Sequence, residues 1–315
     1  MSKSLGHAKT PNIAQLDRGR DFAERRSVRF DPNHQSNDVE DRRGQTSNVV
    51  NAGGLGLIAS LLLRTKYGWI LLVVGAIVYV GARALGFVGS SSDGAGAEGA
   101  KGQIAAGDTE AHFSADVLDD AQQFWETEFK REGKTYPHAT LVLFTDSTST
   151  NCGRGDAATG PFYCPNDQKV YIDLGFFRVM SAQLGAEGQF ARAYVIAHEI
   201  GHHVQKLLGI SDKVERGNAV GESGSSVRLE LQADCFAGIW ARSADARGRL
   251  ERGDIESALN AAARIGDDVL QRESTGKVRP DKFTHGASVQ RLRWLKRGFE
   301  NGSTNDCDTF SASTL

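Results

Sequence analysis

The residues best suited to chemistry are His198, Glu199 and His202, which form the pattern H-E-x-x-H inside the run YVIAHEIGHHVQKLL at 194–208. In a helix, residues four apart project from the same face, so the two imidazoles can occupy adjacent corners of one tetrahedral zinc ion. Glu199 then lies beside the open corner, where a carboxylate can take a proton from coordinated water and pass it to a leaving amine. The pattern predicts a zinc hydrolase.

The alternative for this run is a surface helix that carries two histidines and a glutamate by chance. Apolar residues surround the pattern on almost every side, which indicates a buried helix. Buried His and Glu side chains need partners, and a metal supplies them. His203 points about 100° away from His202 around the helix, so we interpret it as a packing or supporting residue and not as a ligand.

A catalytic zinc site needs a third protein ligand and leaves its fourth position to water. A metzincin-type histidine six residues after His202 is excluded, because a leucine stands there. The next predicted helix carries Glu230 among apolar neighbours, where an unpaired carboxylate is costly, so Glu230 is the best third candidate. Asp234, one turn later, can accept the second N–H of a ligating histidine; an exposed Glu230–Asp234 pair is the alternative. Two other carboxylates are fallback ligands: Glu215 and Glu222.

His285 lies in the short run FTHG at 283–286, before another predicted helix. An imidazole there can donate a hydrogen bond to the oxyanion that develops during peptide hydrolysis. A loop histidine that caps the following helix is the alternative, and the residues alone leave both interpretations open.

The composition fits one sizeable soluble domain with appendages: 315 residues, of which 24% are charged, with a net charge of −2. This balance gives no argument for a nucleic-acid partner, and the globular part has no basic stripe interleaved with aromatic residues. We expect a disordered N-terminal region over residues 1–54, a membrane anchor over 55–88, a Gly/Ala-rich linker over 89–110 and a soluble domain over 111–310.

The anchor contains the run YGWILLVVGAIVYVGARALGFV at 67–88, which is long enough to form one transmembrane helix. A buried core helix and a cleaved signal peptide both suit the flanking sequence less well. The shorter run 55–63 is also apolar, and whether it enters the bilayer stays open. More Lys and Arg precede the anchor than follow it, which predicts a cytoplasmic N-terminus and a soluble domain outside.

An oxidising outer compartment makes disulfides expected for the four cysteines. We predict Cys152–Cys164 as a loop clamp and Cys235–Cys307 as a staple for the C-terminal tail, out of three possible pairings. Four reduced thiols in a cytosolic protein are the alternative.

The soluble domain should be of the α+β class. Hydrophobic spacing predicts helices within 113–129 (with Ser114 as N-cap), from 226 onward, over 255–269 and over 289–299. Apolar runs predict strands at 141–144 and 170–174, the second as the sheet edge that lines the cleft, with a loop over 147–168.

Several motifs together resemble a family of neutral zinc metallopeptidases of bacterial envelopes, which carry a single membrane anchor. They are the run from Ser36 to Gly44, HEIGHH at 198–203, LELQADCFAG at 229–238, and FTHG followed by Gln290, Arg291 and Trp294. The E-x-x-A-D helix and the T-H-x-x-x-x-x-R element are also similar to those of integral-membrane zinc endopeptidases. Because those relatives surround their site with several membrane helices, their substrate class does not transfer.

The resemblance implies a zincin-like (gluzincin) domain that holds one zinc ion per chain. The implied ligands are His198, His202 and Glu230. Glu199 is implied as the base, Asp234 as a support for a ligand, and His285 as a transition-state stabiliser supported by Arg291. We therefore expect a zinc metalloendopeptidase in the bacterial plasma membrane that cleaves protein or peptide substrates on the outer side. The alternative is a non-catalytic envelope scaffold with a structural zinc, and the oligomeric state is not predicted.

Overall fold

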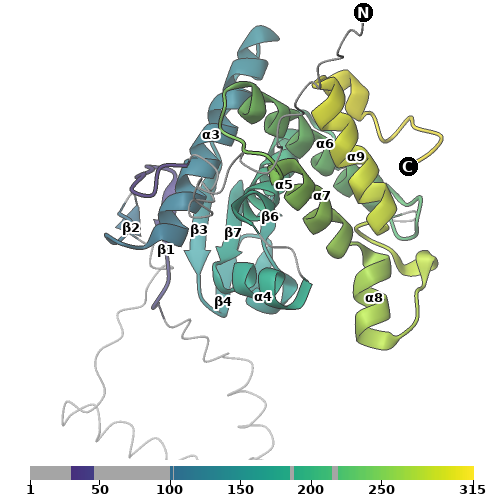
Figure 1. Cartoon of the computed structure of the whole chain (residues 1–315), viewed down its shortest axis with the longest axis horizontal. Helices are drawn as coiled ribbons and strands as arrows, with labels where there is room; N and C mark the ends of the chain where they lie inside the picture. Colours follow the sequence, from purple (N-terminus) through teal and green to yellow (C-terminus); the bar gives the residue numbers. More distant parts are fainter. Residues whose placement is uncertain (1–29, 46–99, 102, 185–187, 215–218) are drawn as a thin grey trace, which may run out of the picture.

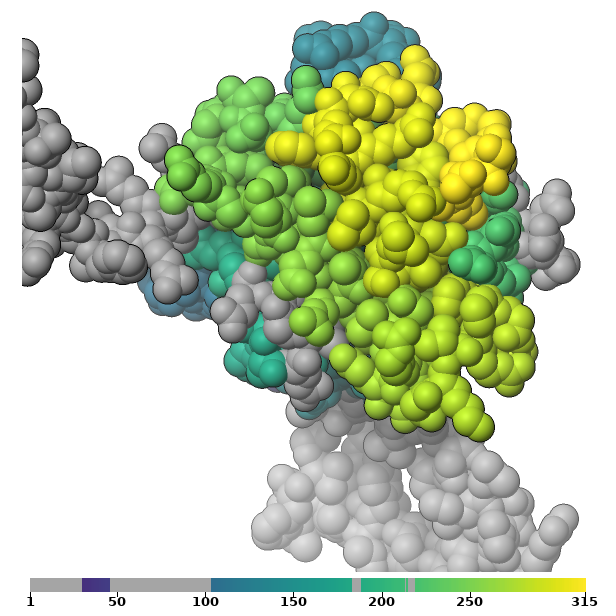
Figure 2. Space-filling view, turned by 45° about the vertical axis from the view of Figure 1, so that its right-hand side comes forward, coloured from purple at the N-terminus to yellow at the C-terminus, as the bar shows by residue number. Residues whose placement is uncertain are grey.

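The computed structural model describes residues 30–45, 100–101, 103–184, 188–214 and 219–315. These residues form a small mixed β-sheet on one side and a layer of helices on the other (Figure 1). The predicted α+β class is confirmed. In a second view, the C-terminal part of the chain, coloured green to yellow, covers much of one face of the molecule (Figure 2).

Five strands form the main sheet: β1 (Val39–Asp41), β2 (Ala100–Lys101), β3 (Thr140–Phe144), β6 (Phe162–Cys164) and β7 (Lys169–Asp173). Their order is β2-β1-β3-β7-β6. The three central strands β1, β3 and β7 are parallel, and the outer strands β2 and β6 are antiparallel to their neighbours. Parallel strands end at the same edge of a sheet, so the segments that follow β1, β3 and β7 start close together.

Alternate residues of the central strands point to opposite faces of the sheet, as strand geometry requires. One set packs into the main core under the helices: Leu141, Leu143, Val170 and Ile172. The other set forms a smaller cluster with Cys164 and Phe162: Val142, Phe144 and Tyr171. A separate hairpin of β4 (Ser147–Thr150) and β5 (Gly153–Asp156) follows β3. The predicted loop over 147–168 therefore contains three short strands.

Seven helices lie in the described residues: α3 (Thr109–Arg131), α4 (Gly175–Leu184), α5 (Gln189–Leu207), α6 (Ser225–Ala246), α7 (Asp254–Arg264), α8 (Asp267–Thr275) and α9 (Ser288–Asn301). Helix α5 is central, because it packs against α3, α6 and α7. The predicted helices within 113–129, from 226 and over 289–299 correspond to α3, α6 and α9. The predicted helix over 255–269 is instead two helices, α7 and α8.

Two local predictions are wrong. Helix α3 begins earlier than Ser114, because Asp108 caps it by accepting a hydrogen bond from the amide of Ala111; the Ser114 hydroxyl donates to the carbonyl of Glu110 inside the helix. The strand near 170–174 is not a sheet edge, because β7 lies between β3 and β6. The edge beside helix α5 is β6.

The disorder predicted for residues 1–54 is wrong for residues 30–45, which fold onto the domain and supply β1. The predicted transmembrane helix over 67–88 and the run 55–63 lie outside the described residues. No helix among the described residues is long and apolar enough to span a membrane.

Both predicted disulfides are confirmed. Cys152–Cys164 closes the segment that holds β5, with Cα atoms 5.8 Å apart. Cys235–Cys307 joins α6 to the C-terminal tail, with Cα atoms 5.6 Å apart.

Candidate metal centre

Helix α5 presents His198 and His202 on one face, which is turned toward helix α6. The two helices can approach closely because residue 201 is glycine: a Cβ added there would lie 3.0 Å from the carbonyl oxygen of Ala233. This close packing brings a carboxylate side chain of α6 within reach of both imidazoles.

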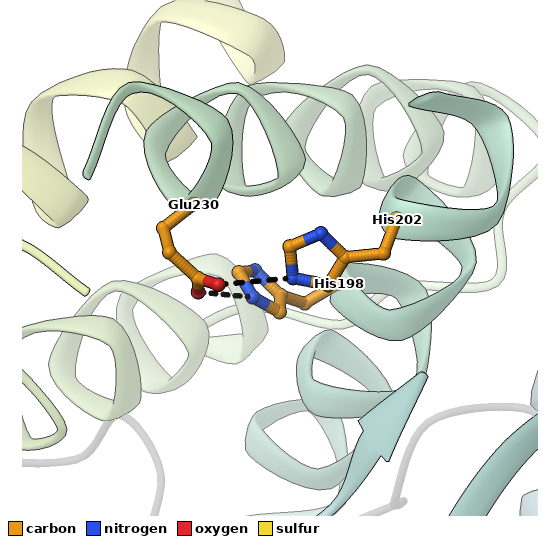
Figure 3. Close-up of side chains that lie close together, drawn as sticks. All are labelled: His198, His202 and Glu230. Atoms are coloured by element: carbon orange, nitrogen blue, oxygen red, sulfur yellow. Dashed lines mark hydrogen bonds and ion pairs between the residues drawn. The ribbon is translucent and has the colours of Figure 1, made fainter. Parts of the chain in front are cut away.

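That carboxylate belongs to Glu230, which points toward both histidines (Figure 3). Nε2 of His198 is 3.2 Å from Oε2 of Glu230, and Nε2 of His202 is 3.4 Å from Oε1. One ligand atom from each of the three residues lies within 4.8 Å of the other two. The structure therefore brings together the three side chains that the sequence singled out.

The opposite nitrogen of each imidazole is held by an acceptor. Nδ1 of His198 lies 2.8 Å from Oδ1 of Asp234, and Nδ1 of His202 lies 2.8 Å from Oε1 of Gln205. The Gln205 amide nitrogen donates to the carbonyl of Leu229 at 2.7 Å, which leaves its oxygen free to accept. A proton fixed on Nδ1 leaves the Nε2 lone pair of each ring for a metal.

These donors fit zinc. Two imidazole nitrogens and one carboxylate oxygen are a set that catalytic zinc sites use, with a fourth position left open. Without a metal, the neighbouring carboxylates favour protonation of the two imidazoles. Burial lowers the pKa of His198, but the carboxylates of Asp234 and Glu230 outweigh this and raise it to about 10. Burial raises the pKa of Glu230, and the two histidines lower it far more.

A buried ion pair stands behind His198. Nε and Nη2 of Arg291, on α9, each donate to one oxygen of Asp234 at 2.9 Å. The hydroxyl of Tyr194 donates to the same carboxylate at 2.6 Å and accepts from Arg291 at 3.1 Å. Asp234 is 0% exposed and Arg291 is 3% exposed. Burial opposes ionisation of Asp234, but Arg291 and His198 lower its pKa to about 2, so its carboxylate stays charged.

Helix α9 packs closely against α6 because residue 298 of α9 is glycine, and this close packing places Arg291 beside Asp234. A Cβ added to Gly298 would lie only 2.0 Å from the carbonyl oxygen of Cys235. The sequence suggested Arg291 as a support for His285; the structure instead joins Arg291 to the Asp234 carboxylate behind His198.

Glu199 follows the first histidine and lines the cavity that opens beside the three candidate ligands. Its side chain is buried, and burial raises the pKa of its carboxyl group against the lowering effect of His198 and His202. A carboxylate with a raised pKa holds a transferred proton more readily, which suits a general base.

The cavity has a volume of about 1380 Å³ and lies between α4, α5, α8 and the edge strand β6. Its wall contains apolar side chains together with the three candidate metal ligands, Glu199 and His285. The apolar members of the wall include Phe162, Phe176, Val179, Val195 and Leu270.

His285 lines the same cavity from the segment before α9. Its backbone amide donates to Oδ2 of Asp267 at 2.7 Å, and its Nδ1 lies 3.4 Å from Oδ1. The interaction with Asp267 raises the pKa of His285. Asp267 is the first residue of α8, so the break between α7 and α8 places this carboxylate against the loop that carries His285.

The remaining sequence candidates lie elsewhere. Nε2 of His203 donates to the carbonyl of Pro137 at 2.7 Å, and its Nδ1 accepts from the hydroxyl of Tyr163 at 3.0 Å; His203 is thus a packing residue, as predicted. Glu222 is exposed and is not one of the three clustered residues. Glu215 lies outside the described residues.

Sequence reasoning missed the roles of Tyr194, Gln205 and Asp267. The partners of Tyr194 come from α6 and α9, so no spacing within α5 reveals its role. Gln205 lies three residues after His202 on α5, and that spacing is the signal that could have found it. Asp267 is joined to His285 across the α8–α9 turn, and only its place at the start of a helix gives a signal, which is typical of a capping residue.

Comparison with known proteins agrees with this geometry. Residues 28–310 match the family described as "Putative neutral zinc metallopeptidase". The uncharacterized protein YpfJ of Escherichia coli K12 is 44% identical over 292 residues, which cover 91% of this chain and 100% of that protein. The uncharacterized protein Rv2575 of Mycobacterium tuberculosis H37Rv is 45% identical over 194 residues, which cover 58% of this chain and 65% of that protein. No solved structure matches the chain.

Proposed function

Because this chain belongs to the neutral zinc metallopeptidase family, we propose that it is a zinc-dependent endopeptidase of the bacterial envelope. One observation carries the proposal: two imidazole Nε2 atoms and the Glu230 carboxylate converge beside Glu199 on the wall of a large cavity. We propose a zincin-like arrangement of the gluzincin type, in which His198 and His202 from one helix and Glu230 from the next hold one zinc ion.

Zinc bound there supplies a Lewis acid that acidifies water and polarises a peptide carbonyl. The chain supplies the remaining groups. Glu199 takes a proton from the attacking water and passes it to the leaving amine. Asp234 and Gln205 hold the two imidazoles in the tautomer that leaves Nε2 free. His285 donates to the oxyanion of the transition state, and Asp267 orients its ring.

Strand β6 provides a place for an extended substrate. It pairs with β7 along one side and is an edge of the described sheet, and Phe162 and Tyr163 line the cavity. An extended peptide can add to such an edge through backbone hydrogen bonds. The bond between Tyr163 and His203 fixes β6 against helix α5 and so sets the distance from this edge to Glu199.

The two disulfides support an oxidising location, because such bonds form and persist outside the cytoplasm. The apolar run at 67–88 supports attachment to the plasma membrane. We therefore propose that the peptidase domain lies on the outer side of that membrane and acts on protein or peptide substrates.

A non-catalytic scaffold with a structural zinc is the competing proposal. Structural zinc sites are closed by four protein ligands. The cluster here offers three ligands, and the adjoining space is a cavity with a buried carboxylate on its wall. These features favour a catalytic centre.

The test compares the full-length protein with its Glu199→Gln variant. Cleavage of an unfolded protein substrate should fall by roughly 10²–10⁴-fold, the contribution of a general base, while one zinc per chain is retained by elemental analysis. Glu222→Gln, which changes an exposed carboxylate outside the cluster, is the matched control and should cleave at the wild-type rate. A Glu199→Gln variant that cleaves as fast as wild type would refute the mechanism, and a wild-type protein that binds zinc without cleaving would support the scaffold.

A further inference from the structure

The C-terminal tail, residues 302–315, follows α9 and packs against α6, the helix that carries Glu230. The disulfide Cys235–Cys307 joins the tail to α6. Cys307 and Thr309 are both 0% exposed, and several backbone carbonyls of the tail accept hydrogen bonds from α6. The tail is therefore packed as part of the domain, and its polar contacts lie on both sides of Glu230 in the sequence of α6.

Arg228, two residues before Glu230, holds the tail on one side. Nη1 of Arg228 donates to the carbonyl oxygen of Thr309 and, at 3.1 Å, to that of Ala312. The Thr309 hydroxyl donates in return to the carbonyl oxygen of Arg228 at 2.6 Å. These bonds join the tail to the turn of α6 from which the Glu230 carboxylate projects.

Gln232, two residues after Glu230, connects the tail to the second histidine. It is 5% exposed, and its Nε2 donates to the carbonyl oxygen of Cys307 at 2.9 Å. Its Oε1 accepts from Nε2 of Gln205 at 3.1 Å, and Oε1 of Gln205 lies 2.8 Å from Nδ1 of His202. One buried chain of hydrogen bonds thus runs from the tail to a candidate metal ligand.

The direction of this chain is set by backbone carbonyls, which can only accept. The Cys307 carbonyl requires Gln232 to turn its NH₂ group toward the tail, so the Gln232 oxygen faces Gln205. The Leu229 carbonyl and the Gln232 oxygen then take both N–H groups of Gln205. Only the oxygen of Gln205 remains for His202, and this oxygen requires a proton on Nδ1. The Nε2 lone pair of His202 is left for the metal.

We propose that Gln232 and the C-terminal tail are positioning elements of the metal centre. They hold His202 in the tautomer that binds zinc, and they hold the turn of α6 that carries Glu230. The inference rests on the zinc site of the proposed function and adds a condition to it: tight zinc binding requires the tail to be fastened to α6 by the Cys235–Cys307 disulfide. A tail that only stabilised the fold would change the free energy of unfolding and leave the zinc affinity unchanged.

Two substitutions of Gln232 in the full-length protein test the hydrogen-bond chain. Gln232→Leu removes one of the two acceptors that hold Gln205. It should weaken zinc binding by about tenfold, the lower limit for the loss of a group that supports a metal ligand, because the Leu229 carbonyl still holds Gln205. Gln232→Glu keeps an oxygen that accepts from Gln205, so its zinc affinity should stay within a few-fold of wild type. Competition with a zinc chelator measures both affinities.

Gln122→Leu is the matched control. Gln122 is also a buried glutamine, 0% exposed, and it bonds to the Asp38 carboxylate and to the amide of Ala139. None of these bonds reaches α5 or α6. This substitution also removes a buried, hydrogen-bonded amide, so it should lower the stability of the protein, but it should leave the zinc affinity at the wild-type value.

Cobalt(II) in place of zinc gives a spectroscopic readout that a purely structural role would not change. Proton NMR of the cobalt-loaded protein should show one shifted, exchangeable N–H signal from Nδ1 of His198 and one from Nδ1 of His202. Gln205→Leu assigns the His202 signal, because it removes the acceptor. In Gln232→Leu the His202 signal should broaden through faster exchange with water. The His198 signal should stay sharp, because its Nδ1 lies beside Asp234.

Removal of the disulfide tests the role of the tail. The double replacement Cys235→Ser and Cys307→Ser should weaken zinc binding by about tenfold, measured where circular dichroism shows the protein to be folded. The double replacement Cys152→Ser and Cys164→Ser opens the other disulfide and is the matched control, which should bind zinc within a few-fold of wild type. If the first double variant does not fold, the Gln232 variants decide the question.

Wild-type zinc affinity in Gln232→Leu would overturn the proposal, and so would an equal loss in Gln232→Leu and Gln122→Leu. An equal loss in Gln232→Leu and Gln232→Glu would overturn it as well, because the affinity would then follow packing and not the acceptor. These measurements use no substrate. The positioning role can therefore fail while the peptidase proposal stands, and a protein that binds zinc through this chain but cleaves nothing would fail only the proposed function.

Discussion

Replacing Asp234 by asparagine would remove the carboxylate that holds both His198 and Arg291. Asp234 accepts from Nδ1 of His198 at 2.8 Å and from two nitrogens of Arg291 at 2.9 Å. Because its pKa is about 2, the wild-type side chain is charged at neutral pH. The substitution therefore leaves the Arg291 charge buried without its counter-ion, and it offers His198 an amide in place of a carboxylate.

Two separate losses follow. Breaking a buried ion pair by removing one partner costs about 3–5 kcal/mol of stability. Losing the acceptor that orients a ligating histidine weakens metal binding by about 10–100-fold, equivalent to about 1.4–2.7 kcal/mol. Denaturant unfolding of the chelator-treated protein measures the first loss, and competition with a zinc chelator measures the second.

A second substitution separates the two effects. Arg291→Met in the Asp234→Asn background removes the unpaired charge, so most of the lost stability should return while zinc binding stays weak. Arg291→Met alone should bind zinc within a few-fold of wild type, because Asp234 still holds His198. Wild-type zinc affinity in Asp234→Asn, or equal loss of affinity in Arg291→Met, would refute the role assigned to Asp234.

Three further predictions concern the scaffold around the site. Gly298→Ala would place a Cβ 2.0 Å from the carbonyl oxygen of Cys235 and should lower the free energy of unfolding by about 1–3 kcal/mol; an unchanged denaturation midpoint would show that α6 and α9 separate freely. The double replacement Cys235→Ser and Cys307→Ser opens a loop with a sequence separation of 72 and should cost about 4 kcal/mol in denaturant unfolding; a loss below about 1 kcal/mol would contradict the staple. Burial raises the pKa of Asp267, but hydrogen bonds from His285 and from backbone amides outweigh it and lower the pKa overall. Asp267 thus adds its full contribution to stability above its unfolded pKa of about 3.9. This contribution is lost as the pH falls toward and below its lower pKa in the folded protein. Asp267→Asn should flatten the pH dependence of unfolding below about pH 4, and an unchanged slope would be inconsistent with this pairing.

Much of the site could be predicted because its signals are local in sequence. The H-E-x-x-H spacing on an apolar helix places two imidazoles on one face, and Glu230 is a carboxylate on an otherwise apolar helix face. The structure brings these residues together at the predicted place. The disulfides were also predicted, from the expected compartment and from the positions of the cysteines.

Strand β1 could not be predicted, because its three residues are mostly charged and its stability comes from distant partners. The buried Glu40 carboxylate is paired with nearby Arg42 and also with Lys169, which lies far along the chain on β7. The order of the sheet, in which β6 and not β7 forms the edge beside α5, also depends on pairing between strands that are far apart in sequence. Local sequence patterns therefore do not predict it. The break between α7 and α8 was hidden as well, since the Asp267 side chain bonds to backbone amides of residues 284–286.

X-ray absorption at the zinc edge of the purified full-length protein tests the central claim most directly. The structure predicts one zinc per chain with two imidazole nitrogens at about 2.0–2.1 Å and a carboxylate oxygen at about 2.0–2.2 Å, and a spectrum that loses this oxygen in Glu230→Ala. A protein without zinc, a site with four protein ligands, or a spectrum unchanged by Glu230→Ala would contradict it.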